Sequence, residues 1–502
     1  MLKKIKYIFI ILISIITLNS CSFDELVSLI NDKYYGINEN SGFHCDDTGN
    51  SIELLEQAFN GKIDQNGNSL LENFEKKDND DELLVSAKRL NIDYNLKNLP
   101  YFEGSTPSIG KLKGLVIPVD FADYPISDKI YENTSVSWQS VSSFYYNSSY
   151  GKLDLSFDIL PWFRLSKNST YYQNMTENNQ KKYTGETPGV SAIIHEVLRN
   201  AQKDYDLSQY DGNNDGYIDA LHIIYSKPMN YTNDDIWWAF QYYNFEYKEY
   251  DKVCPYYYVF SSFHFLFKDD EFNNTKTLIH ETGHLFGLDD YYDYSETEGY
   301  NKGGLGGFDM MDNNFGDHNP LSKLLLGWIN NPILVELKEN SSTTINISPS
   351  SKNGDIIILA NEFDEEKGIF QSYFIIEYIN FNSMLADGGY DIFTKSGIRV
   401  YRVNAELTTY KSDDITYEYF KYNNSKTKFN LIDSFNNGLF SIYPQSKYNL
   451  KFCANNSDLY FEGDSERNLH YSYISINERE NLEYTFHVRK ITDEYATIVI
   501  SR

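Results

Sequence analysis

The sequence predicts an α+β protein in which a domain of mixed helices and strands is followed by a β-rich, sandwich-like C-terminal region. In the first part, apolar runs with helical spacing alternate with β-branched apolar runs. Beyond Trp328 the chain consists of short β-type runs between turn residues, namely TTINIS, GDIIILA, YFIIEYI, GIRVYRV, YTFHVRKI and ATIVIS. At 502 residues the chain is long enough for two or three domains.

Four elements of the mixed domain are predicted in chain order. KLKGLVIPVDF (111–121) is an apolar β-branched run typical of a buried strand, and DALHIIYS (219–226) is a second such run. Between them, VSAIIHEVLRNAQKDY (190–205) has apolar residues at helical spacing. NTKTLIHETGHLF is the next predicted helix, with Asn274 or Thr275 as its expected cap.

The N-terminal stretch MLKKIKYIFIILISIITLNSC has the features of a targeting segment. Three lysines precede an apolar run, residues 7–18, which is shorter than the roughly 20 residues that span a bilayer. LNSC resembles a bacterial lipobox, so Cys21 is expected to be lipidated and to become the mature N-terminus. The alternative is an ordinary signal peptide with an incidental cysteine. Either way, the protein is expected on the extracellular face of a bacterial cell membrane as a lipoprotein, or in secreted form.

The domain organisation follows from these composition changes. A signal segment (1–21) precedes a polar, acidic stretch (22–105) that is expected to be a tether or a removable pro-segment. Within it, amphipathic pieces such as DELLVSAKRL (81–90) are candidate helices. The mixed domain is assigned to 106–330 and the β-rich region to 331–502.

The charge and the cysteines exclude several classes of protein. The formal net charge is −28, and loss of the three lysines of the signal segment lowers it to −31. Nucleic acid is therefore excluded as a partner, because phosphate binding requires a basic face. After Cys21 only Cys45, Cys254 and Cys453 remain, which is neither a disulfide framework nor a C-x-x-C zinc pattern.

IHETGHLFGLDDYYD (279–293) contains the pattern His-Glu-x-x-His. On a helix, His280 and His284 project from the same face, so each can give one nitrogen to a zinc ion. Glu281 lies beside that face, where it can take a proton from zinc-bound water rather than bind the metal. The alternative is a helix that carries two histidines by chance.

Catalytic zinc typically has three protein ligands and a water, so a third protein ligand is required. Gly287 can end the helix abruptly and turn the chain back. Asp290, six residues after His284, is then placed to be that ligand. The glycine, the carboxylate and the secretion signal together favour a zinc site.

HETGHLFGLDDYYD resembles the zinc motif of the immune inhibitor A family of secreted bacterial metallopeptidases, which have the pattern HExxHxxGxxD. The resemblance continues in order over roughly residues 108–410. Four further stretches carry it: GLVIPVDFAD (114–123), FYYNSSYGKLDLSFDILPWF (144–163), YDGNNDGYIDALHIIYS (210–226) and GGFDMMDNNFGDHNPLSKLLLGWI (306–329). They are similar to the family's first catalytic-domain strand, its Ser-Tyr-Gly segment, its acidic segment, and its methionine turn with closing helix.

The resemblance implies that 106–330 is a metzincin-like zinc peptidase domain. It implies zinc binding by His280, His284 and Asp290, with Glu281 as the catalytic acid/base.

Two further implications concern residues near the motif. Met311, with Met310 as the neighbouring possibility, is implied to be the methionine beneath the zinc site. The family usually has proline where this chain has Asp289, so two adjacent carboxylates compete as third ligand, and the spacing favours Asp290.

A second group of oxygen side chains lies in YDGNNDGYID. Asp211, Asn213, Asp215 and Asp219 surround a glycine turn and form half of an EF-hand-like ligand set, without its bidentate glutamate. The alternative is a turn in which these side chains cap their own backbone. A calcium site is favoured, because oxygen donors gathered without a cation repel one another.

The expected function is that of an extracellular, lipid-anchored zinc endopeptidase that cleaves peptide bonds in proteins. Zinc-activated water would attack the peptide carbonyl with Glu281 as general base. The expected partners are a protein or peptide substrate and the membrane. The rival interpretations are a non-catalytic surface adhesin that retains the fold, which has no use for Glu281, and a metallohydrolase of glycans or esters. The sequence does not identify the natural substrate.

Overall fold

The computed structural model describes the protein over seventeen stretches, and the structural statements below refer to them. They are residues 87–93, 106–126, 134–175, 188–229, 236–243, 253–268, 271–272, 275–291, 305, 308–381, 393–405, 407–412, 415–420, 432–433, 456, 459–467 and 484–502. The signal segment with Cys21 lies outside them, so lipidation stays a prediction. None of the described helices is both long and apolar enough to cross a membrane.

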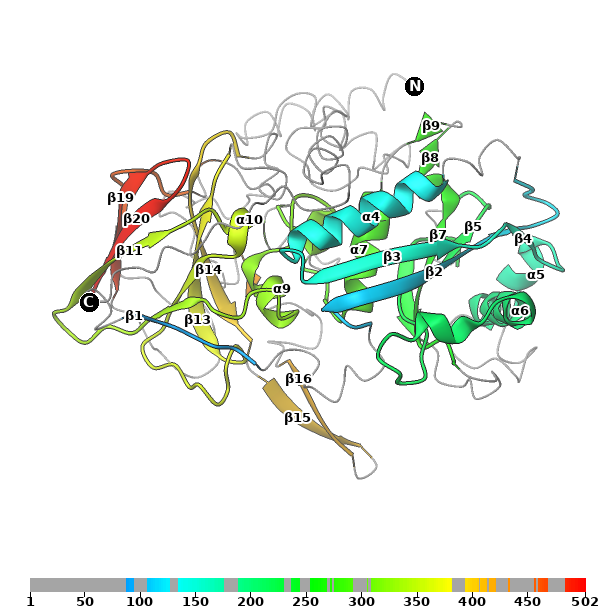
Figure 1. Cartoon of the computed structure of the whole chain (residues 1–502), viewed down its shortest axis with the longest axis horizontal. Helices are drawn as coiled ribbons and strands as arrows, with labels where there is room; N and C mark the ends of the chain where they lie inside the picture. The colour runs from blue at the N-terminus through cyan, green and yellow to red at the C-terminus, as the bar shows by residue number, and fades with distance from the viewer. Residues whose placement is uncertain are drawn as a thin grey trace, which may run out of the picture.

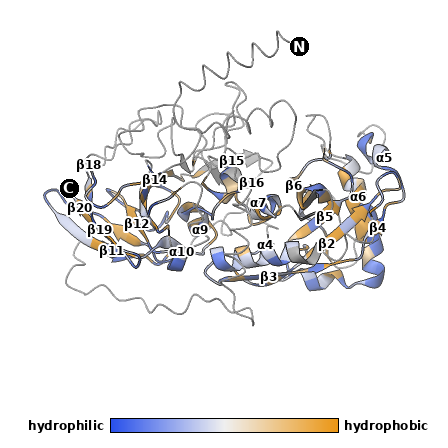
Figure 2. Ribbon diagram, turned by 90° about the horizontal axis from the view of Figure 1, so that it is seen from above, coloured by the Kyte–Doolittle hydropathy of each residue, from blue (hydrophilic) through white to orange (hydrophobic). Residues whose placement is uncertain are grey.

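The mixed domain is built on a six-stranded sheet. Its strand order is β3-β2-β5-β7-β6, and β4 pairs with the end of β2. The strands are β2 (Gly110–Asp120), β3 (Leu153–Ile159), β4 (Phe163–Arg164), β5 (Leu221–Tyr225), β6 (Phe240–Tyr243) and β7 (Tyr257–Ser262). All are parallel except β6, which runs antiparallel to β7 at the edge. Figure 2 shows hydrophobic residues along β2 and β5, as expected for parallel strands covered on both faces.

Alternate residues of β2 point to different helix layers. Val116 belongs to a core formed with α4 (Thr134–Ser148), α7 (Lys276–Leu285) and α9 (Pro320–Leu325). Its neighbours Leu115 and Ile117 belong to a core formed with α5 (Ser169–Gln173) and α6 (Pro188–Asp204) on the opposite face. This follows from the two-residue repeat of a strand. Figure 1 shows α4 and α7 on one side of β2, away from α6.

The predicted elements of this domain are confirmed. The runs 111–121 and 219–226 contain β2 and β5, and 190–205 overlaps α6. α7 forms where expected, with Thr275 at the N-cap position but without a side-chain capping hydrogen bond. The shorter elements are η5 (Leu207–Tyr210), η6 (Phe263–Phe265), β8 (Phe267–Lys268), β9 (Glu271–Phe272), α8 (Met310–Asn313) and α10 (Ser350–Asn353).

The C-terminal region consists mainly of two sheets. The larger has the order β1-β10-β12-β13-β14-β17 and the smaller the order β11-β20-β19-β18. The strands of the larger sheet are β1 (Ala87–Arg89), β10 (Ile333–Val335), β12 (Ile356–Leu359), β13 (Ser372–Ile379), β14 (Gly397–Asn404) and β17 (Ile432–Asp433). The smaller sheet has β11 (Ser342–Ile347), β18 (Ser465–Arg467), β19 (Thr485–Ile491) and β20 (Ala496–Ser501), and β15 (Leu407–Ser412) pairs with β16 (Ile415–Phe420) as a separate hairpin. The six β-type runs predicted from the sequence correspond to β11, β12, β13, β14, β19 and β20.

The larger sheet is the middle layer of the molecule. Ile357 and Ile376 pack against the smaller sheet, which makes the expected sandwich. Ile358 and Ile375, one residue away on the same strands, belong to the core that contains α4, α7 and α9. Both faces of this sheet are therefore buried, and the mixed domain and the C-terminal region share one apolar core.

One sequence expectation is wrong. The end of DELLVSAKRL was expected to be helical, yet Ala87–Arg89 form β1, which pairs antiparallel with β10 at the edge of the larger sheet. The backbone N–H groups of Leu90 and Ile92 extend this pairing, since they donate to backbone carbonyls just before β10 in the chain. The helical spacing was overridden because β10 offers an unpaired edge, where exposed lysine and arginine side chains are tolerated. Part of the segment 22–105 thus belongs to the C-terminal sheet.

Candidate metal centre

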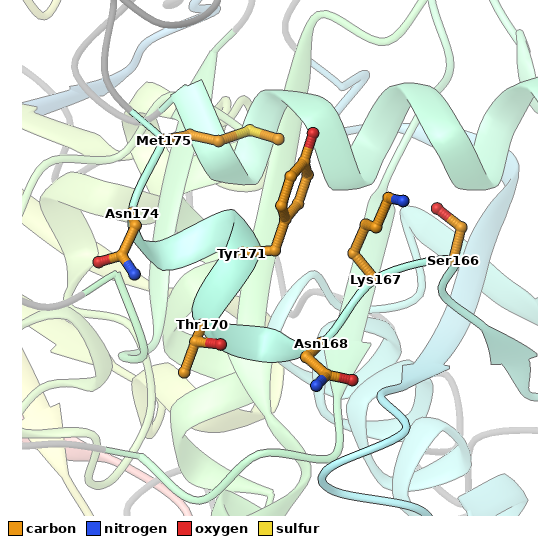
Figure 3. A pocket seen from close by; sticks show the side chains of 7 residues that line it. All are labelled: Ser166, Lys167, Asn168, Thr170, Tyr171, Asn174 and Met175. Atoms are coloured by element: carbon orange, nitrogen blue, oxygen red, sulfur yellow. The ribbon is translucent and has the colours of Figure 1, made fainter.

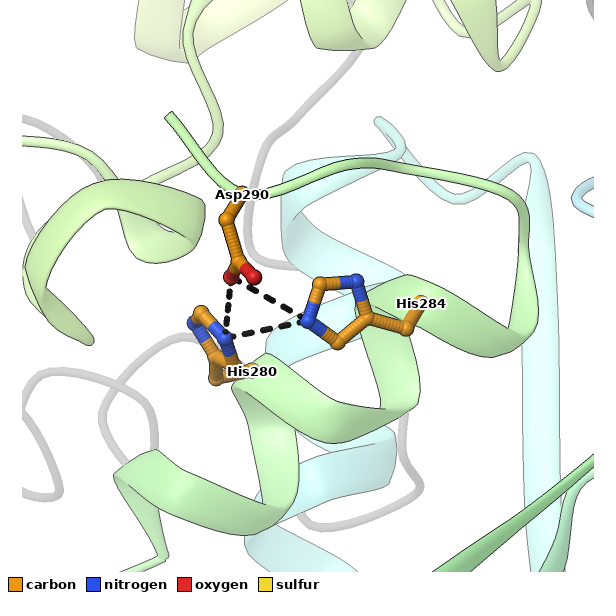
Figure 4. Close-up of side chains that lie close together, drawn as sticks. All are labelled: His280, His284 and Asp290. Atoms are coloured by element: carbon orange, nitrogen blue, oxygen red, sulfur yellow. Dashed lines mark hydrogen bonds and ion pairs between the residues drawn. The ribbon is translucent and has the colours of Figure 1, made fainter. Parts of the chain in front are cut away.

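A sharp turn after α7 brings the predicted third ligand back to the helix. Gly287 has φ +92°, which glycine adopts without strain. The backbone N–H of Gly287 donates to the carbonyl of His284 at 3.0 Å, and the N–H of Leu288 donates to the carbonyl of Gly283 at 3.3 Å. This is the Schellman pattern of helix ends. It returns the chain so that Asp290 faces the histidines, as Figure 4 shows.

Three side chains meet at this point. The Nε2 atoms of His280 and His284 lie 3.2 Å apart. Oδ1 of Asp290 is 2.9 Å from Nε2 of His280 and 3.2 Å from Nε2 of His284. In the described part of the chain, these residues form the one group of three or more His, Cys, Asp or Glu side chains with metal-binding geometry. Asp289 is not a member of this group.

Backbone carbonyls fix the orientation of both imidazoles. Nδ1 of His280 lies 2.8 Å from the carbonyl oxygen of Met310, and Nδ1 of His284 lies 2.6 Å from that of Leu288. A carbonyl can only accept, so each Nδ1 carries the proton and donates. In the neutral form of each imidazole, Nε2 then holds the lone pair and faces Asp290, which is the arrangement that metal-binding histidines require.

The three atoms fit a divalent metal ion. Tetrahedral zinc with bonds of about 2.0–2.1 Å places its ligand atoms about 3.3 Å apart, close to the three observed separations. Oδ1 of Asp290 is buried, and both Nε2 atoms lie within hydrogen-bond distance of it. Once the Nε2 atoms are deprotonated, three electron-rich atoms converge here, and a cation at their centre would satisfy all three. The chemistry of nitrogen and oxygen donors suits zinc without excluding other divalent metals.

The charges of the two histidines and of Asp290 strongly affect one another's pKa values. Burial alone would lower the pKa of His284, but the charge and hydrogen bond of Asp290 outweigh it and raise that pKa to about 10. Burial likewise opposes ionisation of Asp290, yet the two histidines hold the pKa of its carboxyl well below the usual range. Without a metal, protons on the imidazoles thus balance the carboxylate.

Metal binding is expected to release protons. At about pH 7 the metal must displace the proton from Nε2 of His284, whose pKa lies above that pH. Affinity should therefore rise about tenfold per pH unit for each proton displaced as the pH increases from about 6 to 8. Calorimetric titration with zinc in buffers of different ionisation enthalpy measures the number released. An affinity that does not change with pH over this range would contradict the electrostatic coupling.

Glu281 lies beside the three residues without joining them. Its side chain is buried, with 7% of the residue exposed, and burial raises the pKa of its carboxyl. The backbone N–H of Gln241, in the edge strand β6, hydrogen bonds to this carboxyl and partly offsets the effect. A carboxyl next to a cation site can accept a proton from a bound water and return it to a leaving group.

The two methionines support the site in different ways. Met310 supplies the carbonyl that holds His280. The Met311 side chain is fully buried beneath α7, where its Sδ would lie 2.5 Å from a Cβ added to Gly283. The backbone carbonyl of Met311 accepts from the N–H of Tyr291, the residue after Asp290. The predicted methionine residue therefore packs under the histidine helix.

The contact between Gly283 and Met311 predicts a strongly coupled pair of substitutions. Gly283→Ala should be destabilising by up to about 2 kcal/mol, because overpacking costs about 1–3 kcal/mol against about 1 kcal/mol gained in helix propensity. In a Met311→Ala background the same substitution should stabilise by about 1 kcal/mol, since Sδ is gone. Denaturant unfolding of the four proteins measures this. Equal effects of Gly283→Ala in both backgrounds would refute the contact.

The predicted calcium residues lie elsewhere and bond to their own loop. Asp211 accepts from the backbone N–H groups of Asp215 and Gly216, each at 3.0 Å. Asp219 accepts from the N–H of Gly212 at 2.7 Å, and the Asn213 amide donates to Asp215 at 2.8 Å. This matches the alternative of a turn that caps its own backbone. The geometry gives the calcium site no support, and that site stays a prediction.

A histidine and two tryptophans of the mixed domain lie outside the metal centre. His222 is in β5, where burial lowers its pKa to about 3. Trp237 is fully buried, whereas its neighbour Trp238 is 39% exposed and packs edge-on against Phe265.

A surface hollow of about 640 Å³ lies away from these residues (Figure 3). It is formed around α5 and lined by Ser166, Lys167, Asn168, Thr170, Tyr171, Asn174 and Met175. None of them belongs to the metal centre. Because the converging lone pairs and not the hollow carry the chemistry, we assign the candidate site to the metal centre.

Sequence reasoning did not find the carbonyls of Leu288 and Met310 that orient the histidines. No signal in the sequence marks them, since a carbonyl is present at every residue and only the fold determines where it points.

Comparison with known proteins gives little further guidance. No family model and no curated protein matches the chain. Among solved structures, wild-type OgpA from Akkermansia muciniphila is similar over 64% of this chain and 88% of its own, with 12% identity and a TM-score of 0.26. Catalytically inactive OgpA from the same organism, in complex with an O-glycopeptide (glycodrosocin) substrate, gives the same identity and TM-score over 64% and 96%. At that TM-score the similarity carries no argument about this chain, and the resemblance to the immune inhibitor A family stays an expectation.

Proposed function

We propose that this protein is a zinc-dependent endopeptidase with a metzincin-like catalytic domain. One observation carries the proposal: two correctly oriented Nε2 atoms and a buried carboxylate oxygen converge within 3.2 Å beside a second carboxyl group, that of Glu281, which is not one of the converging groups. His280, His284 and Asp290 would hold the zinc, and Glu281 would act on the substrate. The intact Glu281 favours catalysis over the adhesin alternative, because binding alone has no use for it.

The chain's own groups would perform the proton transfers. Zinc, when bound, supplies Lewis acidity that makes a water molecule acidic enough to attack near neutral pH and polarises the peptide carbonyl. Glu281 would accept the proton from the attacking water and deliver it to the leaving amine. Its burial favours the first transfer, since a carboxylate whose conjugate acid has a raised pKa is a stronger base toward the attacking water. The carbonyls of Met310 and Leu288 would hold the imidazoles still during the reaction.

The neighbouring edge strand supports a peptide as the substrate. β6 is the last strand of its sheet within the described chain, and it contacts α7. An extended peptide that pairs with β6 would run past Glu281, because Gln241 of β6 already reaches that carboxyl. Sugars and esters do not form such strand pairs.

The proposed place of action is the extracellular face of the membrane, with Cys21 as the lipid anchor. The support for this is the targeting segment and the LNSC sequence.

The test is casein hydrolysis by purified residues 22–502 with Cys21 replaced. Activity that disappears with a chelator and returns with stoichiometric zinc would support a zinc peptidase. If zinc binds but nothing is cleaved, the N-terminal segment should be trimmed as far as residue 86 and no further, because Ala87 begins β1. Zinc binding without cleavage of protein, peptide, glycan or ester substrates by the trimmed protein would refute the enzyme and favour the adhesin.

A further inference from the structure

Arg399, in the C-terminal sheet, is an arginine with only 1% of its surface exposed. Burying a guanidinium is costly unless its charge and its donors are matched. Its cross-strand partner in the β13–β14 register is Glu377, which is also buried. Between them, the Tyr401 hydroxyl donates to Glu377 and lies 3.5 Å from a guanidinium nitrogen of Arg399. The basic and the acidic side chain thus lie opposite each other in the sheet, linked through the Tyr401 hydroxyl.

The donors of Arg399 point out of the sheet, toward the mixed domain. Nη2 donates to the carbonyl of Leu305 at 2.6 Å, and Nη1 donates to the carbonyl of Phe308 at 3.4 Å. The aromatic rings of Phe308 and Phe393 lie 5.6 Å and 5.5 Å from the guanidinium carbon and enclose it. One side chain of the C-terminal region thus donates hydrogen bonds to two backbone carbonyls, which lie 94 and 91 residues earlier in the chain.

The segment that begins at Phe308, whose carbonyl accepts from Arg399, continues directly into the metal centre. Phe308 precedes Asp309, whose buried carboxylate accepts from the N–H of Met311 at 2.7 Å and begins α8. Within α8, the carbonyl of Met310 accepts the Nδ1 proton of His280. The carbonyl of Met311 accepts from the N–H of the residue after Asp290. The position of this short turn therefore affects two of the three metal-binding side chains.

We propose that Arg399 is a positioning residue of the metal centre: it holds the Phe308 carbonyl so that Met310, two residues on, orients His280. The inference rests on the proposed function, since it takes the three converging residues to bind a metal. The C-terminal region then contributes to the metal centre itself, through a residue that touches neither metal nor substrate. Loss of a group that orients a metal-binding histidine typically weakens metal affinity by about 10–100-fold.

The test measures metal affinity rather than activity, by competition of the full-length protein with a chelator for Zn²⁺. Arg399→Met alone would leave the buried Glu377 without its cationic neighbour, so the decisive variant is Arg399→Met with Glu377→Gln. We expect its zinc affinity to be about 10–100-fold weaker than wild type. Glu377→Gln alone should bind as wild type does. Arg89→Met is the matched control, because Arg89 contacts Asp355 and a backbone carbonyl at the far edge of the same sheet.

The results distinguish a failure of the positioning role of Arg399 from a failure of the proposed zinc function. Unchanged zinc affinity in the folded double variant would overturn the positioning role, even if its melting temperature fell. If the double variant does not fold, Arg399→Lys decides by the same measurement, since it keeps the charge but loses the forked contact to two carbonyls. Arg399→Lys should bind about tenfold more weakly, and wild-type affinity would overturn the inference. A wild-type protein that binds no zinc would instead refute the proposed function, and this inference with it.

Discussion

Glu281→Gln is expected to reduce peptide hydrolysis by roughly 10²–10⁴-fold while the zinc content stays at one ion per chain. The amide has nearly the same shape as the carboxyl, but it cannot accept a proton from the attacking water. The metal should be retained, because Glu281 is not one of the three converging residues. Initial rates of casein cleavage, with zinc measured on the same samples, check this.

The control for this variant is the melting temperature. Replacing a buried carboxyl whose pKa is raised by burial should leave stability the same or slightly higher. A folded, zinc-loaded Glu281→Gln protein with wild-type activity would show that another group moves the proton.

Asp290→Asn is expected to weaken zinc affinity by more than about 100-fold, a larger effect than the loss of a supporting contact. The substitution removes the negative charge next to both Nε2 atoms, from which Asp290 lies 2.9 and 3.2 Å. Chelator competition at constant pH measures the effect.

The chain offers a matched control in the preceding residue. Asp289→Asn makes the same chemical change one position away, outside the three-residue group, and should leave the affinity within a few-fold of wild type. The reverse result, with Asp289→Asn losing zinc and Asp290→Asn retaining it, would reassign the third ligand.

The parts of the site that depend on local geometry were predictable from the sequence. Four residues separate His280 from His284, so any helix places them on one face. Gly287 supplies the left-handed turn, and only three residues then lead to Asp290. In such a short span, spacing and one special backbone angle determine the outcome, and the structure brings together the residues expected.

The supporting contacts were not predictable, because they join distant parts of the chain. In GIRVYRV, Arg399 stands between the apolar residues Ile398 and Val400, a local alternation typical of a strand with one solvated face. In the structure, Ile398 and Val400 face the sandwich, while Arg399 and Tyr401 are buried against the mixed domain. The sequence pattern identified the strand correctly but could not show that its polar face would be covered too.

The helix expected at the position of the short strand β1 was wrong for a related reason. Ala87–Arg89 are three residues, two of them charged, and carry too little periodicity to distinguish a strand from a helix. Their conformation is set by the edge of β10, which follows more than 240 residues later in the chain.

The shared core of the two regions limits how the molecule can be divided. Ile358 and Ile375 of the middle sheet are packed in the same apolar cluster as α4, α7 and α9. A fragment that ends near residue 330 would leave the apolar surface of those helices open to water, and a fragment that begins there would expose the middle sheet. The mixed domain and the β-rich region therefore depend on one shared apolar core, and neither is a module that can be exchanged between proteins by cutting the chain at their sequence boundary.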